Sequence, residues 1–290
     1  MGVRKAVQLA LKAAWEVRLE AKPNAGAAGT RRLWTMGPLI HNARVTQKLQ
    51  EHGFSVLDEA GIMEPSTQPD LNGAVVVVRA HGIGPQIEEA LHRCGAQVVD
   101  ATCPKVKENQ EKVRELSEKG YLILIAGEKN HDEVRGICAY AQKSMVLANR
   151  MDVEPVAEAV FKDQPFAKAA LLAQTTLSKE EFDGIASELL NFFPDLAIFN
   201  TICPATASRQ EALSDLCSVV DAVIVAGDSA SANTRRLAMV AEKHGKPAYL
   251  VENSMDIPPF INKYRVIGLA AGASTPDDII EEIAACLETK

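Results

Sequence analysis

The sequence predicts an α/β protein built as a trefoil of three related units, each with a mainly parallel sheet flanked by helices. Short apolar runs alternate with helical patterns along the chain, which is typical of parallel strands covered by helices on both faces. Cys103 and Cys203 each follow an apolar run, and Gly127 and Gly227 end the next apolar run at the same offset from each cysteine. Gly37 marks a third copy of the pattern, and a fixed internal period indicates repeated structural units.

The first unit is expected to span residues 1–98. Residues 1–16 place apolar side chains on one helical face and basic ones largely opposite, which predicts an amphipathic helix. A transit peptide would also be basic and amphipathic, but this segment lacks serine. A small-residue loop is expected over 21–31, and from Leu33 the runs LWTM, FSVL and VVVV predict strands separated by helices.

The second and third units are expected to span residues 99–198 and 199–290. We interpret QVVDAT and AIFNTI, the residues before the two repeated cysteines, as the strands that open these units. The helix after the first of them has Pro104 at its start and Gly120 at its end, the usual asymmetry of a helix. The first unit has no equivalent opening strand, so we expect its sheet to lack one.

Composition excludes several classes of protein. A net charge of −7 argues against non-specific binding to nucleic acid. No apolar stretch reaches the roughly 18 to 20 residues that span a bilayer, so no membrane association is expected. Six cysteines at irregular spacing in 290 residues do not form a disulfide pattern, which favours a reducing, cytoplasmic location.

The repeated cysteines are candidate metal ligands. In open parallel sheets, ligands bind beyond the carboxyl ends of the strands, where Cys103 and Cys203 are expected. Each cysteine also lies where a helix begins, and the positive end of the helix dipole favours a thiolate, the form that ligates metal. The other four cysteines fall in apolar helical patterns or near a helix end, and we interpret them as packing residues.

Polar residues occupy equivalent loops in the three units. His41, His81 and His131 lie at repeat-related strand ends, which indicates a common ligand. Glu133 is a candidate general acid, because a carboxyl group in a closed pocket can hold a proton near neutral pH. Neutral donors follow other strands and suit an anion held by hydrogen bonds and helix N-termini. They are Thr175, Ser231, Asn233 and Ser274.

Seven motifs together resemble the hydroxymethylbutenyl diphosphate reductase (LytB) family. They occur in order along nearly the whole chain: IHN at 40–42, AHG at 80–82, DATCP at 100–104, HDEV at 131–134, QTTLS at 174–178, CPATASRQEA at 203–212 and AGAST at 271–275. The resemblance implies a trefoil around a [4Fe-4S] cluster, with one cysteine ligand from each unit. It also implies reduction of a small allylic diphosphate to isopentenyl and dimethylallyl diphosphates, the last step of the methylerythritol phosphate route to isoprenoids.

The resemblance also assigns roles by motif. Cys103 and Cys203 would be cluster ligands, and Glu133 with Thr175 would deliver a proton to the departing hydroxyl. Electrons would arrive one at a time from a ferredoxin or flavodoxin. The diphosphate would be held by His41, His81, His131, Thr175, Ser231, Asn233 and Ser274.

The chain departs from the family pattern at three places. The family's first cysteine would fall at the residue before Met1, so the third cluster ligand is missing from the chain and an in-frame extension of roughly ten or more residues is expected upstream. Asp132 replaces a proline, and Ala232 replaces a serine. Three hypotheses follow: an active reductase with a longer N-terminus, a cluster-less diphosphate-binding relative, and a zinc hydrolase using both cysteines and a histidine.

Overall fold

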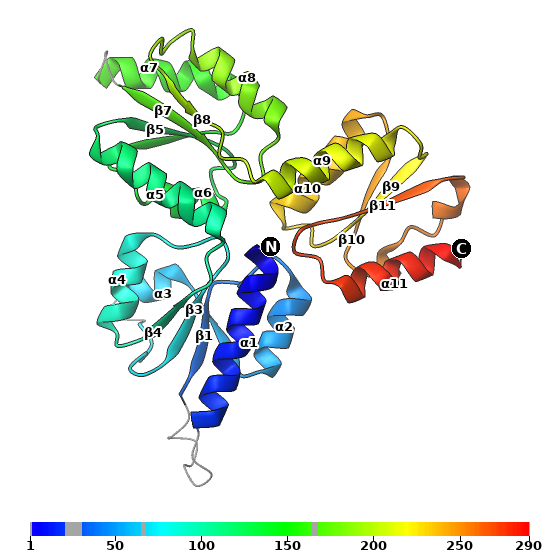
Figure 1. Cartoon of the computed structure of the whole chain (residues 1–290), viewed down its shortest axis with the longest axis horizontal. Coiled ribbons are helices and arrows are strands. Elements are labelled where there is room, and N and C mark those ends of the chain that lie inside the picture. Colours follow the sequence, from blue (N-terminus) through cyan, green and yellow to red (C-terminus); the bar gives the residue numbers. More distant parts are fainter. Residues whose placement is uncertain (1, 21–30, 65–67, 164–167, 290) are drawn as a thin grey trace. The chain divides into compact units, whose positions relative to one another are not determined.

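The computed structural model describes residues 2–20, 31–64, 68–163 and 168–289. Its strands form three sheets, and every paired strand is parallel to its neighbour (Figure 1). The strand orders are β2-β1-β3-β4, β6-β5-β7-β8 and β10-β9-β11. The expectation of three parallel α/β sheets flanked by helices is therefore confirmed. The small-residue loop expected over 21–31 lies almost entirely outside the described residues.

The strands are short and separated by helices. The strands are β1 (Leu33–Met36), β2 (Phe54–Leu57), β3 (Val75–Val78), β4 (Gln97–Asp100), β5 (Leu122–Ala126), β6 (Ser144–Leu147), β7 (Ala169–Ala173), β8 (Ala197–Phe199), β9 (Ala222–Ala226), β10 (Ala248–Val251) and β11 (Ile267–Ala271). The helices are α1 (Gly2–Glu20), α2 (Ala43–Glu51), α3 (Glu59–Met63), α4 (Pro85–Arg93), α5 (Pro104–Glu118), α6 (Asp132–Cys138), α7 (Val153–Asp163), α8 (Lys179–Leu189), α9 (Pro204–Cys217), α10 (Ala232–Lys243) and α11 (Asp277–Glu288). Short 3-10 turns lie at Arg150–Asp152, Ser254–Asp256 and Ile261–Lys263.

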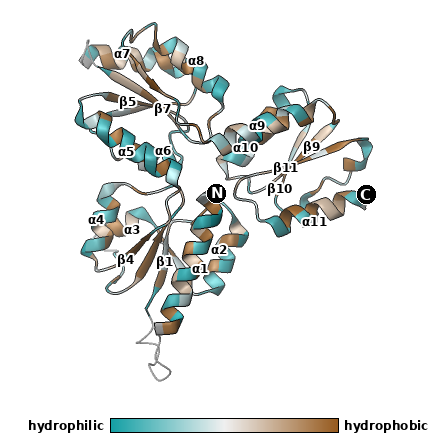
Figure 2. Cartoon of the chain, in the orientation of Figure 1, coloured by the Kyte–Doolittle hydropathy of each residue, from teal (hydrophilic) through white to brown (hydrophobic). Residues whose placement is uncertain are grey.

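The central strands form the cores. Every residue of β3, β5, β7 and β9 is buried, and the strands appear as the most apolar ribbons in Figure 2. A strand with helices on both faces has no polar side, so its sequence is continuously apolar rather than alternating. Helix α1 covers one face of the first sheet through Ala6, Ala10 and Val17, as its amphipathic pattern predicts.

The prediction that the strands before the two cysteines open the following unit is wrong. Strand β4 pairs with β3 in the first sheet, and β8 pairs with β7 in the second. A short crossover helix, such as α4, returns the chain beside the strand it has just left, so the next strand joins the same sheet. The repeated pattern marks where a helix starts, but it does not tell which sheet holds the preceding strand.

The expectation that the first sheet lacks a strand is also wrong, since that sheet has four strands. Among the described strands, it is the third sheet that has three, because no strand beside β11 corresponds to β4 or β8. Strands β3 and β7 are the counterparts of β11 in the other two sheets. All of their residues are buried, whereas in β11 only Gly268 is buried. The residues of β11 are therefore more exposed than those of β3 and β7.

The chain forms two compact units. The first comprises Met1–Ile40, Arg44–Gln174 and Glu180–Thr201, and contains the first two sheets. The second comprises His41–Ala43, Thr175–Lys179 and Ile202–Lys290, and contains the third sheet together with two short loops. No helix in the described part of the chain has both the length and the apolar character needed to cross a membrane.

Candidate functional site

A tight turn after β3 carries His81 in the first unit. The N–H of Gly82 donates to the carbonyl oxygen of Arg79 at 3.0 Å, and Gly82 has a φ of +75°. This left-handed backbone conformation favours glycine, and a Cβ atom here would also push aside the end of the Gln110 side chain. Ala80, which lies inside this turn, is held by a segment outside it: its carbonyl oxygen accepts a hydrogen bond from the N–H of Cys103 at 2.9 Å.

Cys103 is the N-cap of α5, and Pro104 is the first helical residue. The thiol is half-buried, and it is packed against the start of α1, since a Cβ atom on Gly2 would lie only 2.4 Å from its Sγ. The backbone N–H groups at the start of this 15-residue helix present partial positive charge to the sulfur. Cys103 therefore lies at a strand end and at the start of a helix, the position that the sequence predicts for it.

An ion pair braces the chain on both sides of Cys103. Lys107 contacts Asp100, and the N–H of Thr102 donates to Oδ1 of Asp100 at 3.0 Å. Burial alone would raise the pKa of Asp100, but the hydrogen bonds from Lys107 and Thr102 outweigh it and the pKa is lowered. The hydrogen bond to Asp100 in turn raises the pKa of Lys107. The end of β4 and the first turn of α5 are thus held together around the cysteine.

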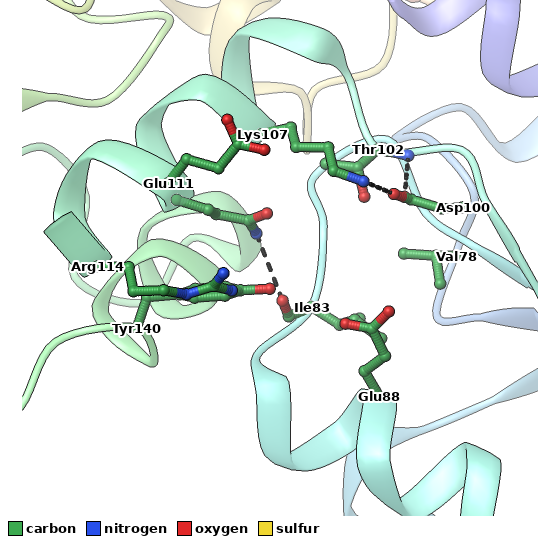
Figure 3. A pocket seen from close by; sticks show the side chains of 10 residues that line it. Val78, Ile83, Glu88, Asp100, Thr102, Lys107, Glu111, Arg114 and Tyr140 are labelled. Atoms are coloured by element: carbon green, nitrogen blue, oxygen red, sulfur yellow. Dashed lines mark hydrogen bonds and ion pairs between the residues drawn. The ribbon is translucent and has the colours of Figure 1, made fainter.

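The same ion pair forms one wall of a cavity of about 200 Å³ (Figure 3). The guanidinium of Arg114 lies 4.8 Å above the ring of Tyr140 on another wall, and burial raises the pKa of that phenol. None of the catalytic, binding or metal residues predicted from the sequence lines this cavity. Sequence reasoning missed the Asp100–Lys107 pair, because a spacing of seven residues carries no signal across a strand, a turn and a helix.

His131 and Glu133 lie together at the start of α6. His131 is the N-cap, and its Nδ1 accepts a hydrogen bond from the N–H of Glu133 at 3.1 Å. A ring that accepts at Nδ1 carries its proton on Nε2, which leaves Nε2–H as a donor. The His81 ring meets the His131 ring edge-on, with centroids 5.3 Å apart, and Glu133 is only 2% exposed. The structure therefore brings these three predicted residues together within the first unit.

The second unit repeats the cysteine arrangement. Cys203 is the N-cap of α9 with Pro204 after it, and its N–H donates to the Thr175 carbonyl at 2.9 Å. Thr175 lies two residues past β7, just as Ala80 lies two residues past β3, so both cysteines are tied to equivalent strand ends. Gln210 adds a 3.4 Å hydrogen bond to the carbonyl of Thr176.

The second unit also gathers polar side chains at the start of α10. Ser231 is the N-cap of this 12-residue helix and Asn233 is its second residue; both are buried, as is Ser274 in the loop between β11 and α11. Both amide atoms of Asn233 and the Oγ of Ser274 are buried and make no hydrogen bond to any described residue. Asn42, the neighbour of His41, donates through Nδ2 to the Ser274 carbonyl at 3.4 Å, so the His41–Ala43 segment lies against the Ser274 loop.

Two groups of residues offer binding chemistry: the buried polar side chains and the two cysteines at helix starts. Buried polar atoms are almost always hydrogen-bonded, so Nδ2 of Asn233 near the start of α10 and Oγ of Ser274 are donors that an anionic ligand could use. Two cysteines in matching positions at helix N-termini, each followed by proline, fit soft thiolate ligation, such as that of an iron–sulfur cluster. The other cysteines pack in apolar surroundings: burial raises the pKa of Cys138 and of Cys217.

The fold and these residues define a parallel α/β protein with two cysteines at helix N-cap positions and buried polar side chains in its strand-end loops. The family model described as LytB protein matches residues 1–288. The chain belongs to the LytB family, as the sequence motifs predict.

Named relatives and solved structures agree with this assignment. The 4-hydroxy-3-methylbut-2-enyl diphosphate reductase of Treponema denticola is 42% identical over 287 residues, which cover 97% of this chain and 93% of the relative. The reductase of Aquifex aeolicus is 33% identical, with coverage of 97% and 90%. The structure of the E-1-hydroxy-2-methyl-but-2-enyl-4-diphosphate reductase from Plasmodium falciparum matches 99% of this chain and 84% of its own, with a TM-score of 0.84 and 28% identity. A second structure, of the reductase that ends the non-mevalonate pathway, has a TM-score of 0.66 at 32% identity and covers 100% of this chain and 95% of its own.

Proposed function

We propose that this chain reduces 4-hydroxy-3-methylbut-2-enyl diphosphate to isopentenyl and dimethylallyl diphosphates in the cytoplasm. The observation that carries the proposal is the pair of buried donors without a partner in the described residues, Nδ2 of Asn233 in the first turn of α10 and Oγ of Ser274 in the loop before α11, which suit a diphosphate. The names of full-length relatives support the same substrate class. In the reaction, two electrons and two protons enter, the allylic C–O bond breaks, and the oxygen leaves as water.

Cys103 and Cys203 are the proposed ligands of a [4Fe-4S] cluster. When bound, such a cluster would pass single electrons to the substrate from a ferredoxin or flavodoxin. Of the described cysteines, only these two follow a strand end and cap a helix, so the described part of the chain offers two of the three cysteines implied by the resemblance.

The remaining residues bind the substrate and supply a proton. In the second unit, His41, Thr175, Ser231, Asn233 and Ser274 are the proposed diphosphate ligands, and in the first unit His81 and His131 are. Neutral donors stabilise the anion without burying paired charges, which would be costly to desolvate. The buried carboxyl group of Glu133 is the proposed proton donor to the departing hydroxyl, together with the hydroxyl of Thr175.

An anaerobic preparation tests the proposal. We expect a brown protein containing iron and sulfide that, with a chemical reductant, converts the substrate to both five-carbon diphosphates. Cys103→Ser should lose iron and turnover, whereas Cys94→Ser, at the end of α4, should keep both. A colourless protein that binds diphosphate would instead support the cluster-less alternative, and stoichiometric zinc with hydrolytic activity would support the zinc hydrolase.

A further inference from the structure

Arg79 is a buried arginine directly beside the turn that carries His81. Its side chain is only 4% exposed. Its Nε donates to the carbonyl oxygen of Gly82 at 3.3 Å, and this hydrogen bond stabilises the turn. Its Nη2 contacts the carboxylate of Glu59 on α3. Its Nη1 lies 3.5 Å from Oδ2 of Asp132. One guanidinium therefore contacts three separate segments of the first unit.

Asp132 is the residue through which Arg79 reaches the second histidine. It follows His131 directly and is the first residue of α6. Its other oxygen, Oδ1, lies 2.6 Å from Nη2 of Arg135, which in turn lies 4.0 Å from Oε2 of Glu59. The two carboxylates and two guanidinium groups balance in charge, so the buried Arg79 has no unpaired charge, while Arg135 at the other end of the network is exposed.

The backbone around Arg79 is shaped to admit the guanidinium. Gly37, at the end of β1, has a φ of +66°, and a Cβ atom there would lie 2.6 Å from Nη1 of Arg79. Any side chain at position 37 would therefore displace the arginine as well as strain the backbone. The end of β1, the turn after β3 and the start of α6 all meet this one group.

We propose that Arg79 and Asp132 are positioning residues that fix the His81 turn and the His131 cap relative to one another. This rests on the proposed role of both histidines in binding the substrate diphosphate. The planar guanidinium suits this task, because its donors have a fixed geometry and each can hold a different acceptor. Both act without touching the substrate: Asp132 acts through the adjacent His131, and Arg79 through the turn that carries His81 two residues further on.

The test uses two substitutions of the same residue in the full chain. Asp132→Ala removes the link to Arg79, and we expect it to weaken binding of inorganic pyrophosphate about tenfold. Asp132→Pro also removes the carboxylate, but it restrains the same backbone position. Proline is accepted at the first position of a helix, and the residue before it must be extended. His131 already has φ −73° and ψ 137°, so Asp132→Pro should restore affinity to within about threefold of the original protein.

A control variant and an NMR measurement distinguish a positioning role from a general loss of stability. Glu108→Gln breaks an exposed ion pair with Lys105 on α5 and should change neither affinity nor melting temperature by much. Histidine side-chain NMR of the ligand-free protein should show shifted His81 and His131 signals in Asp132→Ala, with His244 unchanged. If the original protein does not bind pyrophosphate, the proposed diphosphate site is refuted. The spectra of the ligand-free variants still test the positioning role independently. Unchanged histidine signals in Asp132→Ala, or an affinity of Asp132→Ala for pyrophosphate equal to that of the original protein, would overturn the inference.

Discussion

Replacing Asn233 with alanine should make the ligand-free protein more stable and its binding of diphosphate weaker. Asn233 is 6% exposed, and neither its Nδ2 nor its Oδ1 is hydrogen-bonded to a described residue. A buried polar group without a partner costs about 1–3 kcal/mol, and the amide has two such atoms. We therefore expect this amide to contribute more to ligand binding than to the stability of the ligand-free fold.

The magnitude follows from opposing terms. Asn233→Ala removes the unsatisfied amide and gains about 0.5 kcal/mol of helix propensity, since position 233 lies within α10. The lost packing of the amide costs about 1–2 kcal/mol. We expect a net stabilisation of about 1 kcal/mol, which raises the melting temperature by about 2 °C in a chain of this size. A lost hydrogen bond to a charged ligand, worth about 1.5–3 kcal/mol, weakens binding about 10- to 100-fold.

Calorimetry measures both quantities on the same samples. Thermal unfolding without ligand gives the change in melting temperature, and titration with inorganic pyrophosphate gives the affinity. Asn233→Asp is the matched control: it keeps the shape but buries a negative charge, so it should lower both stability and affinity. A clearly lower melting temperature for Asn233→Ala, or an affinity equal to that of the unmodified protein, would refute the argument that the amide is kept for a ligand.

Two further predictions concern the first unit. Glu133→Gln should leave pyrophosphate affinity nearly unchanged and lower turnover of the cluster-loaded enzyme by about 100-fold or more, and a loss of affinity at constant turnover would make Glu133 a binding residue instead. The Asp100–Lys107 ion pair should respond to pH. Because the pKa of Asp100 is lowered in the fold, its stabilising effect is complete above about pH 5 and is lost as the pH falls below about 4. Because the pKa of Lys107 is raised in the fold, its stabilising effect is complete below about pH 10 and is lost as the pH rises above that. The urea midpoint of Asp100→Asn should therefore approach that of the original protein near pH 3, and a difference independent of pH would contradict this account.

Local patterns in the sequence were sufficient for much of the fold. Continuous apolar runs identified the buried strands, because a strand covered on both faces has no polar side. Proline and glycine marked the ends of α5, and the repeat located Cys103 and Cys203 at matching helix N-caps. These features depend on neighbours a few residues away, so they can be read without knowing the rest of the structure.

Only the tertiary structure decided which segments are partners. The sheet that holds β4 depends on its hydrogen bonds to β3, and its own sequence is compatible with either neighbouring sheet. The contacts of Arg79 with Glu59 and Asp132 join residues 20 and more than 50 positions apart. Likewise, the unsatisfied amide of Asn233 is a property of its surroundings and not of its residue type. Charge pairing, burial and strand pairing arise from residues distant in sequence, and no local pattern records which of them the folded chain brings into contact.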